Sequence, residues 1–143
     1  MSAGSGIAAG GLIACGLGDP RKCRHHVVLR SEARPAVSLI ETAWIESPVI
    51  YPRSKVPPND IVKLARDAGR WAGIYEVHAV QVNFIEPATW KGQVPKEIHH
   101  KRIRASLNGY EKEILAAALE GISPGKQHNV LDAVGIGLWA RGR

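Results

Sequence analysis

Two acidic residues, Glu46 and Asp132, occupy positions where a carboxylate can take part in chemistry. Glu46 follows a short apolar stretch, and Pro48 stops a strand ladder two residues later because proline has no N–H to donate. We therefore predict Glu46 at the carboxyl end of a strand, where open α/β sheets bind their ligands. Asp132 lies near the start of the last helical stretch. Because carboxylate oxygens are the ligands that Mg²⁺ prefers, the two acids indicate a metal-dependent site.

Each acid also has a purely structural explanation. Glu46 is equally well explained as an exposed loop acid just past a strand. Glu41 competes for the same role but lies within the apolar run, and Glu86 is a second, weaker strand-end acid. Asn129 precedes Asp132 by three residues, a spacing typical of a helix N-cap followed by an acid in the first turn. On a helix this spacing also places the amide and the carboxylate on one face, as two neighbouring ligands would require.

A strongly basic segment, residues 90–104, is the third feature. It contains five lysines and arginines against the single acid Glu97, together with two histidines. Such a cluster suits contacts with a phosphate backbone and carries no sequence specificity, although a solvated helix face has the same composition. The basic residues are Lys91, Lys96, Lys101, Arg102 and Arg104.

The composition indicates one basic globular domain over residues 1–143. The formal net charge is +6 and the sequence pI is near 9.6, which favours a polyanionic partner such as nucleic acid, or else an ordinary basic surface. No apolar run approaches the ~20 residues of a membrane helix, so we expect no membrane association. Without a basic leader segment at the start, we expect a cytoplasmic location. The remaining composition-based alternative is a zinc site, for which Cys15, Cys23, His25 and His26 lack the usual short cysteine knuckle.

The order of apolar segments predicts a mixed sheet flanked by helices. We expect a fragmentary strand before the Gly10-Gly11 turn, a hairpin over 12–16 and 25–30, the strand of Glu46, and a parallel strand over 79–85. A first helix is expected over about 59–76, with Asn59 or Asp60 as its cap, and a second from Pro95, with Ile98 and Ile103 facing inward. Two more helices are expected over 110–119 and from near His128 to Trp139. This order fits an RNase H-like domain, and other three-layer α/β folds remain possible.

Three blocks of the chain together resemble a RuvC-type Holliday-junction resolvase of phages and bacteria. The blocks are WIESPVIYPRSKVPPNDIVKLARDAG (44–69), IEPATWKGQVPKEIHHKRI (85–103) and HNVLDAVGIGLWARGR (128–143), and they stand in the order of that family. The resemblance implies an RNase H-like fold that cleaves branched DNA as a homodimer with two divalent ions, Mg²⁺ or Mn²⁺. It assigns Glu46 as the central-strand acid and Asp132 as the last-helix acid.

The same resemblance assigns roles to other side chains. Asn129 stands where a further acid often lies, so one ligand would be a neutral oxygen. Lys96 would lie near the scissile phosphate, and backbone contacts would come from Lys91, Lys101, Arg102 and Arg53. The family's first strand, which ends in an Asp-Pro-Gly turn, has no counterpart before Met1. We therefore expect the sheet to lack its first strand and one acid, with the reading frame starting further upstream.

Three functions remain open from the sequence. The first is a metal-dependent, structure-selective endonuclease for branched or duplex DNA, active in recombination and repair. The second is a catalytically inactive nucleic-acid-binding protein of the same fold, because the two ions need several carboxylates to offset their charge. The third is a nucleotide-binding domain of the wider superfamily, for which the chain shows no phosphate loop.

Overall fold

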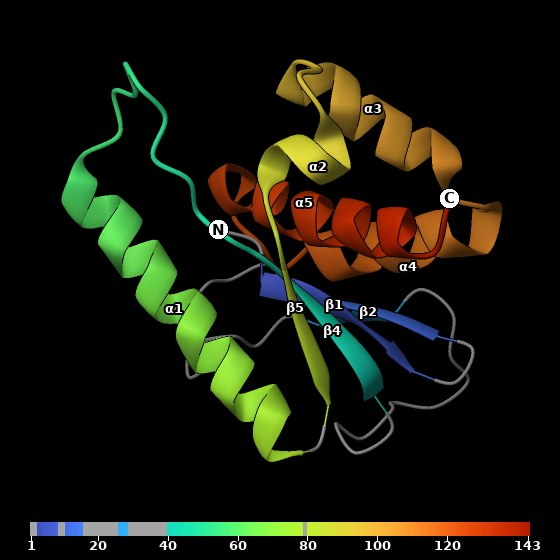
Figure 1. Cartoon of the computed structure of the whole chain (residues 1–143). Coiled ribbons are helices and arrows are strands. Elements are labelled where there is room, and N and C mark those ends of the chain that lie inside the picture. The colour runs from blue at the N-terminus through green and yellow to red at the C-terminus, as the bar shows by residue number, and fades with distance from the viewer. Residues whose placement is uncertain (1–2, 9–10, 16–25, 29–39, 79) are drawn as a thin grey trace.

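The computed structural model describes residues 3–8, 11–15, 26–28, 40–78 and 80–143, and they form a mixed α/β domain. Five strands make one sheet in the order β3-β2-β1-β4-β5. Helices lie against the sheet, with α1 along its β4–β5 end and the remaining helices gathered on another side (Figure 1). The strands are β1 (Ala3–Ala8), β2 (Gly11–Cys15), β3 (His26–Val28), β4 (Ile40–Glu46) and β5 (Gln81–Ile85).

The pairing of the strands confirms the predicted hairpin and adds a strand at the centre. β2 and β3 pair antiparallel, with Cys15 opposite His26. β1, expected to be no more than a fragment, lies between β2 and β4 and runs antiparallel to both. The sheet therefore has a strand in its central position, where the resemblance had led us to expect a gap. Among the strands of the described residues, only β4 and β5 run parallel, so their carboxyl ends share one edge.

Helix α1 (Pro58–Val77) covers β4 and β5. Its buried residues recur at helical spacing, as predicted, and are Ala68, Trp71, Ala72 and Tyr75. Neither Asn59 nor Asp60 caps the helix: the N-cap is Pro57, and Pro58 occupies the first turn, where its missing N–H costs no hydrogen bond. The predicted cap is therefore wrong, although the helix is placed correctly.

Four helices follow β5 and build the main core. They are α2 (Pro87–Lys91), α3 (Lys96–Ser106), α4 (Gly109–Leu119) and α5 (Pro124–Ala140). Within the core Ile103 of α3 is 4% exposed, as predicted, whereas Ile98 is 47% exposed and its predicted inward position is wrong. Within the described part of the chain, no helix is long and apolar enough to span a bilayer.

Helix α5 is the axis of this core because it is buried from Val130 to Leu138. It packs across β1 and β2 and also reaches β4, α2 and α3. Gly135 allows this close approach: a Cβ there would lie 2.7 Å from Ile103 Cδ1 and 2.7 Å from Trp90 Cζ3, well inside contact distance. The glycine therefore fixes how α2 and α3 sit on α5, and with them the side chains around Asp132.

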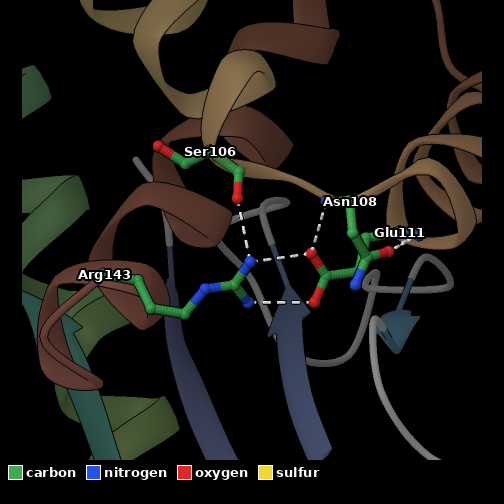
Figure 2. Close-up of polar contacts among 4 residues, drawn as sticks. All are labelled: Ser106, Asn108, Glu111 and Arg143. Carbon is green, nitrogen blue, oxygen red and sulfur yellow. Dashed lines mark hydrogen bonds and ion pairs between the residues drawn. The ribbon is translucent and has the colours of Figure 1, made fainter.

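A partly buried ion pair ties Arg143 to the junction of α3 and α4 (Figure 2). Glu111 is fully buried and its carboxylate accepts two hydrogen bonds of 2.9 Å from the Arg143 guanidinium. The same carboxylate accepts the backbone N–H of Asn108 at 3.0 Å, and the Asn108 side chain accepts the N–H of Glu111 in return. Arg143 also donates to the Ser106 carbonyl oxygen at 2.8 Å, so one arginine fixes the turn between the two helices.

Candidate functional site

Glu46 is the last residue of β4, as predicted. The ladder continues for one more hydrogen bond, from Ser47 N to Ile85 O at 2.8 Å, before Pro48. The Glu46 side chain is partly buried and accepts a 2.9 Å hydrogen bond at Oε2 from Trp90 Nε1 of α2. Because the Trp90 indole holds the Glu46 carboxylate against the core, the alternative of an exposed loop acid is wrong.

The surroundings of Glu46 disfavour its charged form. Burial raises its pKa above the usual value, and the negative charge of Asp132 raises it further. The Trp90 hydrogen bond and the positive charge of Lys91 lower the pKa and only partly offset this. The structure thus brings Glu46 and Asp132, from opposite ends of the chain, close enough for their charges to interact.

Asp132 lies in the middle of α5, and this position excludes the explanation that it is an acid in the first turn of the helix. The helix begins at Pro124 after the N-cap Ser123, rather than near His128. Asn129 is therefore not the cap, and Asp132 is not a first-turn acid that serves the helix dipole. Asp132 is 8% exposed as a residue, and a buried acid in a helix interior needs partners of its own.

Two α3 residues supply those partners. His100 Nε2 lies 2.8 Å from Asp132 Oδ1, a hydrogen bond in which the carboxylate accepts. Lys96 Nζ lies 3.9 Å from Asp132 Oδ2. Lys96 is half exposed, so its charge faces both the carboxylate and the solvent. Asn129 stands one helical turn before Asp132 on the same face of α5.

Two further histidines surround this acid. Burial lowers the pKa of His99, and the positive charges of Lys91 and Arg102 contribute to the decrease, although Asp132 opposes it. Burial also lowers the pKa of His128, followed by the nearby charge of Lys96. Both imidazoles are thereby kept neutral near pH 7, the form that can bind a metal or hydrogen-bond a substrate.

The predicted basic residues divide into two groups. Lys91 and Lys96 border the carboxylates, since the charge of Lys91 acts on Glu46 and Lys96 pairs with Asp132. Arg102 lies on α3 beside Trp90 and Lys91, in a pocket next to the carboxylates. Lys101 and Arg53 are exposed and are not brought to the carboxylates; Arg53 stands in the loop after β4 with a positive φ of 69°.

The residues of the site fit one divalent ion better than two. Glu46 and Asp132 offer hard oxygen ligands, and the Asn129 amide is a possible neutral one. Among the described residues, however, no group of three or more His, Cys, Asp or Glu side chains is arranged to hold a metal. A two-ion site would need more carboxylates than this part of the chain supplies. The cysteine and histidine alternative, with Cys23 and His25, lies outside the described residues.

Trp90 and His100 are the site residues that sequence reasoning missed. The indole N–H of Trp90 needs a partner once buried, and that partner, Glu46, is 44 residues away in sequence. The only signal for His100 was its place in the basic segment beside Lys96. No family model, curated protein or solved structure matches the chain.

Proposed function

We propose that this chain is a structure-selective endonuclease of the RuvC type, with an RNase H-like fold, that cleaves branched DNA in the presence of Mg²⁺ or Mn²⁺ and acts as a homodimer. The observation that carries the proposal is the convergence of Glu46 and Asp132. The two acids were singled out separately from strand-end and helix positions, and they lie within charge–charge range at the carboxyl end of β4.

The roles of the residues follow from their contacts. Glu46 and Asp132 would hold a divalent ion, with Asn129 as a neutral ligand. The chemistry that a bound ion supplies is activation of water and neutralisation of charge on the phosphate. Lys96 neutralises Asp132 in the free protein and is exposed enough to turn towards a phosphate. Trp90 fixes the orientation of Glu46 through its indole N–H.

The basic face around these acids supports a nucleic-acid substrate. Lys91 and Lys96 flank the carboxylates, and the exposed bases Lys101, Arg102 and Arg104 continue along α3. Cations arranged around an acidic centre attract a phosphate backbone by counterion release and hold it against the acids. The domain's net charge of +6 also attracts the negatively charged nucleic-acid backbone at longer range.

A second candidate is a nucleic-acid-binding protein of the same fold without catalysis. It is favoured by the pairing of Asp132 with His100 and Lys96, which neutralises the acid within the protein. It is also favoured by the lack of a third acidic ligand in the described part of the chain. Binding of DNA without cleavage would then be the whole activity.

Cleavage of a synthetic four-way junction separates the two candidates. The full chain is incubated with the junction and with a linear duplex of the same sequence, in Mg²⁺ and in EDTA. We expect Mg²⁺-dependent cleavage of the junction, lost in Glu46→Gln and in Asp132→Asn and kept in the control Glu86→Gln. Cleavage that survives both site changes would overturn the proposed centre. Tight junction binding with no cleavage by the unchanged protein would establish the second candidate.

A further inference from the structure

A pocket of about 220 Å³ lies between α2, α3 and α5, beside the carboxylates. Among the described residues, the cationic side chains that line it are Lys91, Arg102 and Arg143, and no acid lines it. Arg143 is paired with Glu111, so the positive charge open to a ligand comes from Arg102 and from Lys91, which also acts on Glu46. Such a pocket is built for an anionic ligand or for the anionic part of a larger one.

Aromatic rings form another part of the lining. Trp90 and Trp139 both line the pocket. Trp139 is only partly buried, and its ring is held edge-to-face against Trp44 with ring centroids 5.2 Å apart. Trp90 is 6% exposed and presents little of its surface, so the ring available to a ligand is that of Trp139. An indole face held in a fixed orientation is a platform on which any nucleobase can stack.

The size of the pocket limits what enters it. Ligand sites for drug-sized molecules occupy about 300–1,000 Å³, so this pocket admits a smaller group, such as one planar ring system. The position of the pocket is equally informative, because Trp90, which lines the pocket, donates its indole N–H to Glu46 Oε2. A strand anchored here would pass one side chain away from the acid.

We propose that this pocket holds one unstacked base of a single-stranded DNA segment against Trp139, with the adjoining phosphates on Lys91 and Arg102. The proposal rests on the proposed function and names the part of the substrate that the site holds: an unpaired nucleotide at the branch. A base that is already unpaired enters at least cost, because no stacking or pairing must be broken. The pocket would thereby favour branched DNA over a continuous duplex.

The test compares two strands of equal charge, both in EDTA so that no cleavage occurs. One is a short oligothymidylate, and the other is an abasic strand with the same number of phosphates, each labelled for fluorescence anisotropy. We expect the strand with bases to bind about tenfold more tightly, the effect of stacking one base. Trp139→Leu should remove this preference, whereas Tyr110→Leu, which alters a 61% exposed ring on α4, should keep it. Equal affinity of the unchanged protein for the two strands would overturn the proposal.

The phosphate contacts have their own matched pair of variants on α3. Arg102→Ala should weaken both strands by the same factor and flatten the salt dependence, because it removes a phosphate contact. Arg104→Ala, also exposed but outside the pocket, should weaken both strands less. Equal losses in the two variants would contradict a specific place for the phosphates.

A measurement on the unchanged protein covers the case in which Trp139→Leu does not fold. A strand with one 5-iodouracil is photocrosslinked, and the modified peptide is identified by mass spectrometry. Crosslinking to Trp139 or Trp90 supports the pocket, and crosslinking confined to Tyr51 or Tyr110 refutes it. The two proposals fail differently: equal binding of the two strands alongside junction cleavage rejects the pocket alone. A preserved base preference without cleavage rejects the endonuclease alone.

Discussion

The pairing of Glu111 with Arg143 gives the sharpest prediction for stability. Glu111 is fully buried and accepts three hydrogen bonds, two of them from the guanidinium. Glu111→Gln keeps the shape of the side chain but removes the charge and turns an NH₂ group towards the arginine. A hydrogen bond to a charged group contributes roughly 1.5–3 kcal/mol, and breaking a buried ion pair costs ~3–5 kcal/mol. Because the Arg143 side chain is 29% exposed, we expect a loss below the range for a fully buried pair, ~2–3 kcal/mol.

The reverse change should cost more. Arg143→Met removes the guanidinium that donates two hydrogen bonds to the buried Glu111 carboxylate, and we expect a loss of ~3–5 kcal/mol. The double variant should lose less than the sum of the two, with a coupling of roughly 2 kcal/mol. Urea unfolding followed by circular dichroism measures all three values, and Glu111→Gln should lower the Tm by roughly 6–12 °C.

The surface pair of Lys63 and Asp60 serves as the control. Its atoms are 3.7 Å apart and its side chains are 71% and 53% exposed, so Lys63→Met should cost less than ~0.5 kcal/mol. If Glu111→Gln costs no more than this control, the ion pair is not closed in solution. The anchoring of the α3–α4 turn by Arg143 would then be refuted.

Three further predictions concern the site and its core. Burial raises the pKa of Glu46, so the folded protein binds this proton more tightly than the unfolded chain, and stability is lost as pH rises above 4.5. In urea titrations, Glu46→Gln should therefore be more stable than the unchanged protein by about 1 kcal/mol at pH 7 and equally stable well below pH 4.5. His99 has a lowered pKa and a buried Nε2 without a hydrogen-bond partner in the described residues. His99→Leu should therefore raise the free energy of unfolding by about 1 kcal/mol, and by more as pH falls below 6.5, because the unfolded chain then takes up the proton. A loss of stability at every pH would contradict this. Gly135→Ala should lower the free energy of unfolding by about 1–3 kcal/mol, because its Cβ meets two core side chains. Gly69→Ala, whose Cβ has nothing within 4 Å, should raise it by roughly 0.5–1 kcal/mol. Equal thermal shifts of the two variants would refute the close packing at Gly135.

The sequence was informative where local rules decide the structure. Glu46 was predicted at a strand end because Pro48 cannot extend a ladder, and the ladder does end at Ser47. The hairpin of β2 and β3 was predicted from a short β-branched segment, and the buried face of α1 from apolar residues at helical spacing. The start of α5 was predicted too late, near His128, whereas the helix begins at Pro124, because proline is well suited to the first turn of a helix.

Contacts between distant segments could not be predicted in the same way. Trp90 and Glu46 meet only because α2 docks on α5, and that docking depends on the missing Cβ of Gly135. The spacing of Asn108 and Glu111 is a local capping signal, but nothing near Glu111 in the sequence indicates Arg143, 32 residues away. The place of Glu46 at a strand end could be predicted from the sequence, whereas the partners of Glu46 and Asp132 depend on tertiary packing.

The central claim is that Glu46 and Asp132 form one divalent-ion site, and calorimetric titration with Mn²⁺ tests it directly. The protein, Glu46→Gln, Asp132→Asn, the double variant and the control Glu86→Gln are compared at one pH. We predict one strong site in the unchanged protein and the control, lost in either site variant, with no further loss in the double variant. Unchanged Mn²⁺ affinity in both single variants, or no binding by the unchanged protein, would contradict the claim.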